Sequence, residues 1–489
     1  MTEKKGNSIA TDSFLLIFVR CITMMASIVQ SMVLARTLSK SVFGTYSQAL
    51  LIISLIAPFL SIGLDNSINY FFNKTDDLDE KKKYINTIMG LSFIIGIIGG
   101  FMIILSQQGL VRAYNNQALA PLVIYIAFRP CLQNLIGLYQ PLYISSGYAK
   151  IIAVRNLIIS VLQVTVIVLT AIFSENLIII FGLLLVLDIG QLLFFAQYYQ
   201  KHNFKIQLFK IEKRYIKSII KYSVPMLLAI MVGTISINLD KLVVSSLMSL
   251  EDFALYSNMA KELPFSFVAA SFTAVITPKI VQLLSRNEME KFHKLWSDYL
   301  EIGYTITWIL CVGAIIMAPE IIEILYSTKY LTQNGIFVFQ IYTVVAMFRF
   351  TYFGLVPSAK GETKIVMYYS ILGVVINLIL NFPFFYLFGM IGPPIATLIS
   401  LMIMAYFYFR KSTKLVGGKL FSVLRIKKMF TLFLEMFICG ILVVFVTNTI
   451  GQITSNKIVL FIIGYGLFVG IMSLIKYKDI KKLIHDLNH

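Results

Sequence analysis

The chain has 489 residues, of which 58% are hydrophobic and 13% charged, and its mean hydropathy is +0.81. A soluble globular chain is about half apolar even when glycine is counted, so this composition excludes a soluble protein and indicates a polytopic membrane protein. The net charge of +18 would suit nucleic acid. No soluble segment is long enough to fold as a basic domain, however, so we expect no nucleic-acid partner.

Taken in chain order, the apolar segments predict an all-α fold that crosses the membrane repeatedly. A helix needs about 20 mostly apolar residues to cross the hydrocarbon core. By that measure we expect fourteen spans, at approximately 13–34, 44–65, 84–105, 118–143, 153–172, 177–199, 219–246, 252–281, 298–318, 334–357, 365–387, 390–409, 429–450 and 457–475. The first segment lacks a clear cleavage site and is followed at once by the second, so we expect a retained helix and not a signal peptide.

The basic residues predict the orientation of these spans. If the N-terminus is cytoplasmic, most of the 42 lysines and arginines fall in cytoplasmic segments, as the positive-inside rule requires. We therefore expect both termini in the cytoplasm. The outer loops are all short, which leaves no room for an external catalytic domain.

Two weak internal repeats predict a pair of similar lobes. A shift of 210 positions places Val33, Ser39, Phe43, Tyr46, Ser47 and Ser61 on Val243, Ser249, Phe253, Tyr256, Ser257 and Ser271. A second match, Gly147–Ile152 with Gly361–Val366, follows the fourth span of each half. Parallel repeats imply two pseudo-symmetric six-helix lobes around a central cavity. We expect an N-lobe at 1–199, a cytoplasmic basic linker at 200–217, a C-lobe at 218–409, a cytoplasmic basic loop at 410–428, and two further spans with a basic tail at 429–489.

Four basic residues lie deep inside predicted spans, well away from the span ends, namely Arg20, Arg129, Lys261 and Arg349. A charge at such depth costs a few kcal/mol even on lenient scales, so we expect each to face a wet cavity or a partner. For any single residue, snorkelling or a local pair such as Lys261 with Glu262 is the alternative. The acids at comparable depth are fewer: Asp188, Glu262 and Glu435. A lumen with surplus positive charge fits an anionic cargo.

A third group of candidate residues is mostly uncharged. Asn377 and Asn381 are four residues apart and so share a helix face, and Thr397 lies in the next span, beyond the pair Pro393–Pro394. With Asp240 from the seventh span, their oxygens could surround a sodium ion. The alternative is that these side chains form an interhelical hydrogen-bond cluster that only packs the helices together. The spacing of the residues alone favours this alternative.

The remaining reactive side chains argue against an enzyme. The four cysteines each stand alone in an apolar segment, so we expect neither a disulfide nor a metal site. All four histidines lie in predicted cytoplasmic segments, which leaves no histidine relay across the membrane. The chain also has no Gly-x4-Gly-Lys loop for a nucleotide phosphate.

Several motifs point to a family. Ala-Arg-Thr-Leu at Ala35–Leu38, Phe-Gly-Thr-Tyr at Phe43–Tyr46 and Gly63-Leu64 are followed by Asp240-Lys241, Tyr256-Ser257, Ala318–Leu331 and Gly361-x-x-Lys364. In these the chain resembles the Wzx-type polysaccharide flippases, in the polysaccharide transporter branch of the multidrug/oligosaccharidyl-lipid/polysaccharide (MOP) exporter superfamily. The likeness covers nearly the whole chain.

This resemblance implies a MATE-like fold and a non-enzymatic function in the bacterial inner membrane. Such proteins move undecaprenyl-diphosphate-linked oligosaccharides from the inner to the outer leaflet by alternating access, for O-antigen, lipopolysaccharide or capsule synthesis. The implied partners are the lipid-linked glycan, membrane lipids, a polysaccharide polymerase and a chain-length regulator. The cationic residues Arg20, Arg129, Lys261 and Arg349 would bind the cargo. No cofactor is implied apart from a coupling Na⁺ or H⁺.

The resemblance also bears on the polar group. In the related lipid II flippases, a sodium site joins an Asp of the seventh span to an Asn and an Asp of the eleventh and a Thr of the twelfth. Asp240, Asn377, Asn381 and Thr397 fit that pattern except that Asn381 replaces an acid. Proton coupling through Asp240, Asp188 or Glu262 is the alternative.

Two other functions remain to be separated from a flippase. A multidrug or cation antiporter of the same superfamily would share the lobes but needs lumenal acids, whereas this chain offers mostly bases. A glycan polymerase or ligase would need sizeable external loops, which the sequence does not contain.

Overall fold

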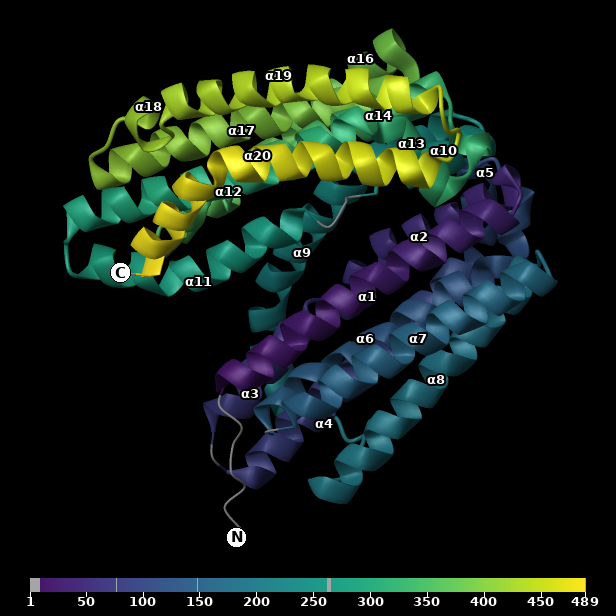
Figure 1. Cartoon of the computed structure of the whole chain (residues 1–489). Coiled ribbons are helices and arrows are strands. Elements are labelled where there is room, and N and C mark those ends of the chain that lie inside the picture. Colours follow the sequence, from purple (N-terminus) through teal and green to yellow (C-terminus); the bar gives the residue numbers. More distant parts are fainter. Residues whose placement is uncertain (1–8, 76, 147, 262–264, 489) are drawn as a thin grey trace. The chain divides into compact units, whose positions relative to one another are not determined.

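The computed structural model describes residues 9–75, 77–146, 148–261 and 265–488 (Figure 1). Every regular element in these ranges is a helix, which confirms the all-α prediction. The chain divides into two compact units, Met1–Ala254 and Leu255–His489. The prediction for the N-lobe ended at residue 199, whereas the first compact unit also contains the seventh predicted span.

The first unit consists of long helices and two short elements. In chain order they are α1 (Ile9–Thr37), α2 (Lys40–Ser61), α3 (Leu64–Lys74), α4 (Leu78–Leu105), α5 (Gln107–Ala113), the 3₁₀ helix η1 (Gln117–Leu122), α6 (Val123–Ser145), α7 (Ala149–Phe173), α8 (Leu177–His202) and α9 (Lys213–Leu247).

The second unit begins within α10 and holds the remaining helices. These are α10 (Leu250–Met259), α11 (Ser266–Ser285), α12 (Met289–Ile316), α13 (Ala318–Tyr326), η2 (Thr328–Tyr330), α14 (Gln333–Phe348), α15 (Leu355–Ala359), α16 (Thr363–Phe388), η3 (Gly389–Ile391), α17 (Gly392–Val416), α18 (Leu420–Val423), α19 (Ile426–Gly451) and α20 (Lys457–Asn488).

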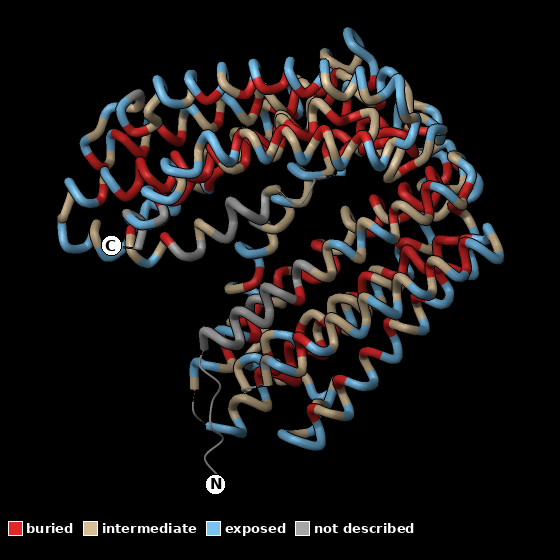
Figure 2. Tube along the Cα trace, viewed as in Figure 1, coloured by how far each residue is buried: buried red, intermediate tan, exposed pale blue. Residues whose placement is uncertain are grey.

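The helices account for the predicted spans. Among the described residues, ten helical stretches are long and apolar enough to cross a membrane, and one of them, Thr363–Val416, holds both α16 and α17. Two shorter apolar helices, Ile22–Thr37 and Gln333–Phe348, coincide with the first and tenth predicted spans. In Figure 2 the buried residues of each unit lie where its helices face one another, while outward faces are exposed, as expected of helices surrounded by lipid.

Two predicted spans, the eighth and the tenth, are interrupted in their interior and not only near an end. The eighth, 252–281, is split between α10 and α11, and Ala260 and Lys261 already lie outside both helices. The tenth, 334–357, ends as α14 at Phe348 and resumes only at α15. Here the Trp308 indole N–H donates to the Met347 carbonyl at 3.1 Å, which satisfies one of the acceptors freed at the helix end.

The repeat predicted from sequence has the same local structure in both copies. Ser39 caps α2 by accepting a hydrogen bond from the Val42 N–H at 3.3 Å, and Ser249 accepts one from the Asp252 N–H at 3.1 Å before α10. Gly44, in the second turn of α2, lies so close to Leu250 of α10 that an added Cβ would be 2.3 Å from the Leu250 carbonyl oxygen. The two serine caps, at Ser39 and Ser249, therefore occupy equivalent positions in structure as well as in sequence.

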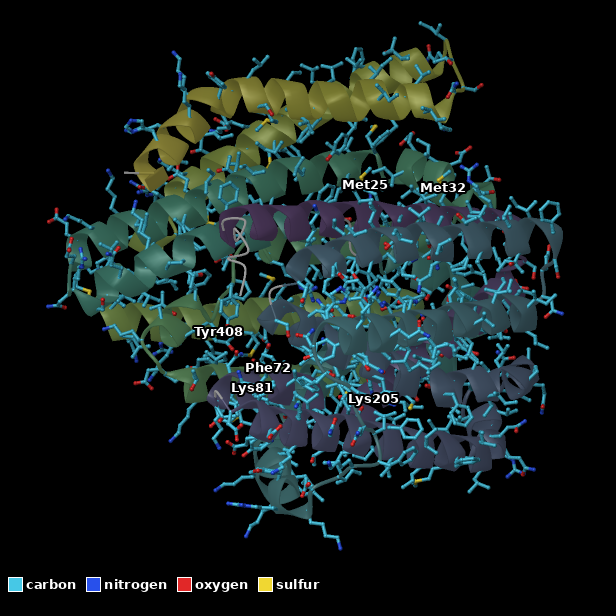
Figure 3. All side chains as sticks on the ribbon, turned by 90° about the horizontal axis from the view of Figure 1, so that it is seen from below. Met25, Met32, Phe72, Lys81, Lys205 and Tyr408 are labelled. Atoms are coloured by element: carbon cyan, nitrogen blue, oxygen red, sulfur yellow. The ribbon has the colours of Figure 1, made fainter. Side chains whose placement is uncertain are left out.

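An aromatic cluster forms much of the core of the first unit. Phe71, Tyr84, Tyr139, Tyr143, Phe195 and Tyr199 are all buried within it. Lysines border the cluster: the Lys74 ammonium lies 5.6 Å from the centre of the Phe71 ring, and Lys81 lies 4.9 Å from that of Phe72 (Figure 3). The end of the unit that carries these lysines is the one predicted to face the cytoplasm.

The two basic connections are more ordered than the sequence predicts. In the linker 200–217, Phe204, Ile206 and Leu208 pack on the aromatic cluster, and the Gln207 N–H donates to Asn86 at 2.9 Å. These three apolar residues therefore cover the protein core. The loop 410–428 is also shorter than predicted, because α17 continues to Val416 and α19 begins at Ile426.

Candidate functional site

A polar cavity opens within the first unit. It measures about 570 Å³ and is bordered by α1, α6, α7 and α8, with Thr23, Gln133, Gln140, Arg155, Gln163 and Gln191 among its lining residues. Cavities of 300 to 1,000 Å³ are the usual size of small-molecule sites. Apart from Val19 and Ile159, the side chains that line it are amides, hydroxyls and one guanidinium, a set that suits sugar hydroxyls and an anion.

The predicted residues Arg129 and Asp188 form an ion pair beside this cavity. Arg129 Nε lies 3.4 Å from Asp188 Oδ2, and Asp188 is fully buried. Gln133 and Gln191 also donate to Asp188 Oδ1, at 2.6 and 3.2 Å. The guanidinium lies 5.3 Å from the centre of the Tyr125 ring. Helical periodicity explains the grouping, because Tyr125, Arg129 and Gln133 are each four residues apart on α6.

Arg155 contributes the positive charge that this pair does not neutralise. It lies in the second turn of α7 and donates hydrogen bonds to Gln191 Oε1 and, at 2.8 Å, to Asn156 Oδ1. Its buried Nε has no hydrogen-bond partner, and among the described residues no carboxylate lies within 4 Å. Among the described residues the site therefore holds two guanidiniums but one carboxylate, which pairs with Arg129, so it is suited to an anionic ligand.

Sequence reasoning missed Arg155 because it lies near the start of the fifth predicted span and was treated as cytoplasmic. A signal was nevertheless present. Arg155, Asn156, Ser160 and Gln163 form a polar stripe along one face of an otherwise apolar helix. Such a stripe at helical spacing predicts a wet surface inside the membrane.

The other predicted cations occupy different settings. Arg20 belongs to α1, but its side chain lies outside the described residues. Lys261 is exposed in the segment between α10 and α11, and Glu262 lies outside the described residues. Arg349 follows the last residue of α14 and is partly buried. Lys261 and Arg349 thus both lie where a predicted span is broken.

The polar group on α16 and α17 is held together by hydrogen bonds. The Asn377 amide N–H donates to Thr397 Oγ1 at 2.8 Å and to Ser400 Oγ at 3.2 Å, and Asn381 donates to Asn377 Oδ1 at 2.6 Å. All four side chains are buried. Ser400 is an addition to the residues predicted from sequence. Asp240 is buried in α9, which belongs to the first unit.

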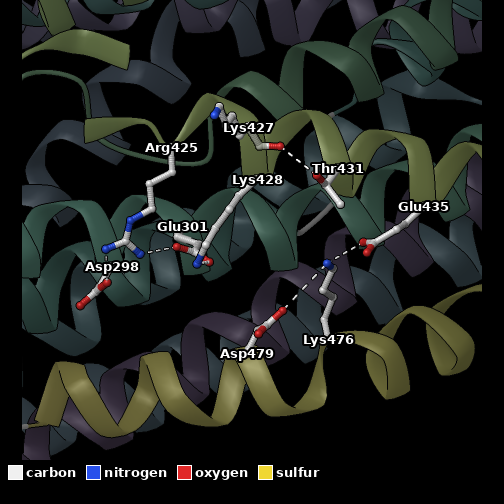
Figure 4. A network of polar contacts seen from close by, with 9 residues as sticks. All are labelled: Asp298, Glu301, Arg425, Lys427, Lys428, Thr431, Glu435, Lys476 and Asp479. Carbon is white, nitrogen blue, oxygen red and sulfur yellow. Dashed lines mark hydrogen bonds and ion pairs between the residues drawn. The ribbon is translucent and has the colours of Figure 1, made fainter. Parts of the chain in front are cut away.

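A second charged network, which the sequence did not reveal, lies in the second unit (Figure 4). Arg425 pairs with Asp298 at 2.7 Å and with Glu301, and Lys428 pairs with Glu301 at 2.6 Å. Asp298 and Glu301 are three residues apart on α12 and both are buried, so they present one acidic face to the start of α19. Nearby, Lys476 of α20 pairs with Glu435 of α19 at 2.6 Å. Around Arg425 and Lys428, two bases thus meet two acids.

No group of three or more histidine, cysteine, aspartate or glutamate side chains in the described parts of the chain could hold a metal ion. The described cysteines, Cys131, Cys311 and Cys439, are buried and free. The candidate site therefore consists of hydrogen-bonding groups and guanidiniums, an arrangement that can bind and orient an anionic, hydroxyl-rich molecule.

Comparisons with known proteins agree with a transporter fold. The family model described as "Polysaccharide biosynthesis protein" matches residues 33–334, and no curated protein matches the chain. The lipid II flippase MurJ, in an inward closed conformation, has a TM-score of 0.74 at 16% identity, over 95% of this chain and 99% of that one.

Two further solved structures share the fold. An inward-facing multidrug resistance MATE family transporter of the MOP superfamily has a TM-score of 0.63 at 12% identity, over 81% of this chain and 94% of that one. A MOP superfamily transporter from Pyrococcus furiosus, described as having a binding pocket of reverse polarity, has a TM-score of 0.52 at 14% identity, over 85% and 99%. The MATE-like fold expected from sequence is confirmed.

Proposed function

Because the chain belongs to the polysaccharide biosynthesis protein family, we propose that it is a flippase that moves undecaprenyl-diphosphate-linked oligosaccharide repeat units from the inner to the outer leaflet. The observation that carries this proposal is the polar cavity of the first unit, in which Arg155 has no carboxylate partner among the described residues. The cargo is an anion with many hydroxyl groups, and the cavity offers a guanidinium together with amides and hydroxyls.

Each part of the cargo has a counterpart in the site. Arginine binds phosphate oxygens through a planar fork of N–H donors, so Arg155 suits the diphosphate. Gln133, Gln140 and Gln163 can both donate to and accept from sugar hydroxyls. The fold likeness to MurJ, whose own cargo is lipid II by its name, supports a lipid-linked substrate.

The finer features of the proposal follow the family resemblance. We assign the chain to the Wzx-type branch, with O-antigen or capsule units as its cargo, in the bacterial inner membrane and with both termini cytoplasmic. A polysaccharide polymerase and a chain-length regulator would act on the delivered units. The residues proposed to bind cargo in the lumen are Arg20, Arg129, Lys261 and Arg349, and we add Arg155 to this proposal because it lines the polar cavity.

We propose that an ion gradient drives the cycle. Asp240, Asn377, Asn381 and Thr397 are the candidates for sodium, whereas Asp188, Asp240 and Glu262 are the candidates for protons. Transport into vesicles with an imposed sodium gradient or an imposed proton gradient separates the two ions, because only the coupled gradient accelerates transport.

The proposal is tested by flipping in proteoliposomes. A fluorescent lipid-linked oligosaccharide is reconstituted with the protein, and a membrane-impermeant reductant reports the fraction exposed outside. We expect wild-type protein to exchange the cargo between leaflets, and Arg129→Ala and Lys261→Ala to abolish exchange and, in cells, surface polysaccharide export while still inserting. Normal export by all four single alanine variants of Arg20, Arg129, Lys261 and Arg349 contradicts the cationic lumen.

The main alternative is a multidrug or cation antiporter, which the MATE likeness also permits. That function requires acids to hold cationic drugs, and the one acid beside the cavity, Asp188, is paired with Arg129. A deletion strain with normal surface glycan but greater sensitivity to cationic dyes favours the antiporter. Loss of chain-length control in the glycan, with export intact, would instead favour a polymerase.

A further inference from the structure

An apolar groove lies between α7 and α8 in the first unit. It measures about 700 Å³ and is lined by residues that include Val154, Ile158, Leu162, Val186 and Phe194. All of these side chains are exposed, in helices that are long and apolar enough to cross the membrane. In a bilayer the groove therefore meets hydrocarbon chains and not water.

The groove and the polar cavity have a common wall. Arg155, Ile159 and Gln191 line both of them. An amphiphile can therefore bind with its apolar part in the groove and its polar part in the cavity, with Arg155 between them. Each part of such a molecule then contacts protein surface of its own polarity. The buried Nε of Arg155, which has no partner among the described residues, lies in this wall.

The groove has a charged end and the depth of one leaflet. Lys150 and Arg155 border it near the start of α7, at the end predicted to be cytoplasmic. From Lys150 to Leu162 is about 18 Å of helix at 1.5 Å per residue, and half of the hydrocarbon core is about 15 Å thick. Its dimensions and charge thus match an anionic lipid of the inner leaflet.

We propose that this groove receives the prenyl chain of the cargo, with the diphosphate held by Arg155 and Lys150 and the glycan entering the polar cavity. The proposal rests on the proposed function and identifies where the lipid part of the cargo binds before translocation. A phospholipid is the rival occupant. It has a small head group that would not use the adjoining 570 Å³ polar cavity, whereas a lipid-linked oligosaccharide occupies both.

Gly190 offers a way to close the groove without disturbing the fold. It lines the groove on α8, and an added Cβ would meet nothing within 4 Å. Gly190→Leu should therefore fill space that only a ligand would use. Gly182 is also exposed on α8 with open space around an added Cβ, but it does not line the groove, so Gly182→Leu is the matched control. Val186→Trp, at an exposed groove position, is a second closing variant.

The first test measures binding of undecaprenyl diphosphate to the purified full-length protein in phosphatidylcholine nanodiscs by native mass spectrometry. We expect Gly190→Leu and Val186→Trp to weaken binding at least tenfold, and Gly182→Leu to bind as wild type does. Excess phosphatidylglycerol should displace the prenyl lipid poorly. Wild-type binding by both closing variants overturns the proposal, and equal displacement by phosphatidylglycerol reassigns the groove to anionic phospholipid.

The second test separates this proposal from the proposed function. The flipping assay is run with the same variants after their folding has been checked by size-exclusion chromatography. If wild-type protein flips the oligosaccharide and Gly190→Leu does so at the same rate, the groove proposal fails while the function stands. If wild-type protein binds undecaprenyl diphosphate in the groove but flips no lipid-linked oligosaccharide, the proposed function fails instead.

Discussion

The helices α7 and α16 are equivalent in the repeat but use their polar residues differently. Each begins at the third residue of its Gly-x-x-Lys motif, and a shift of 214 positions places Arg155 on Tyr369, Asn156 on Ser370 and Gln163 on Asn377. On α7 these residues line an open cavity. On α16, the Asn377 amide N–H groups instead donate hydrogen bonds to Thr397 and Ser400 of α17. Polar groups at equivalent positions thus face either an open cavity or a neighbouring helix.

The charged networks of the two units differ in the same way. In the first unit two guanidiniums, Arg129 and Arg155, lie near one carboxylate, Asp188. In the second unit Arg425 and Lys428 meet two carboxylates, Asp298 and Glu301. The first arrangement leaves Arg155 without a paired carboxylate among the described residues, whereas in the second each base has a carboxylate partner and α12 is linked to the start of α19. The two networks therefore differ in charge balance, and the variants below test whether that difference separates binding from packing.

The largest effect should follow removal of the uncompensated charge. Arg155→Gln keeps a polar side chain but deletes the guanidinium, and a hydrogen bond to a charged group contributes about 1.5 to 3 kcal/mol. We expect flipping in proteoliposomes to fall roughly tenfold to a hundredfold at unchanged folding. The control is Tyr369→Phe at the equivalent position of α16, which should flip normally. If Arg155→Gln flips the cargo at the wild-type rate, the polar residues of α7 have no role in transport that those of α16 lack.

Removing the acid of the first network should mainly affect stability. Asp188→Asn leaves Arg129 without a counter-charge, and breaking a buried pair in this way costs about 3 kcal/mol. Thermal unfolding in detergent measures the loss. The double variant Asp188→Asn with Arg129→Gln should recover most of it, because no unpaired charge remains. A double variant as unstable as the single one would show that the pair is not the cause.

Glu301→Gln should have a smaller effect in the second network. Arg425 keeps Asp298 as a partner, and Lys428 is more than half exposed, so we expect a loss of about 1 to 2 kcal/mol. The flipping rate per folded molecule should not change. Lys428→Ala is the milder companion variant and should lie within about 1 kcal/mol of wild type. Impaired flipping by folded Glu301→Gln would give this network a role in transport.

The smallest effect is expected on α17. Thr397→Val removes one acceptor of the Asn377 amide, which contributes about 1 kcal/mol. Because the Asn377 carbonyl oxygen already accepts from Asn381, the Asn377 side chain is satisfied within the cluster, and an unchanged sodium dependence of flipping in this variant would favour the proton candidates over the sodium site. The concentration of sodium that gives half-maximal flipping is the measurement. If this concentration rises, Thr397 is an ion ligand and the cluster is more than packing.

The overall fold could be predicted because the bilayer imposes it. A long apolar segment has to become a helix, so composition and length alone located nearly all of the spans. The broken spans could not be predicted in this way, since the end of α14 depends on Trp308, a residue distant in sequence. These breaks bear on the candidate site, because two of its predicted cations, Lys261 and Arg349, lie at them.

Individual site residues were easier to identify than their partners. A buried charge is visible in sequence, so Arg129 and Asp188 were both singled out, but their pairing requires knowing that α6 and α8 face each other. Asp298 and Glu301 were overlooked because they lie near the predicted start of a span, where an acidic side chain is expected to be exposed to water. Arg155 was overlooked for the same reason.

The close approach of Gly44 to α10 means that the first copy of the repeat excludes a side chain at this position, whereas the second copy carries one. Gly44 corresponds to Ala254 under the shift of 210. An alanine at 44 would place its Cβ 2.3 Å from a backbone oxygen, a contact that no side-chain rotation can relieve. The Phe-Gly-x-Tyr motif should therefore persist in the first half of related chains while its second-half counterpart drifts.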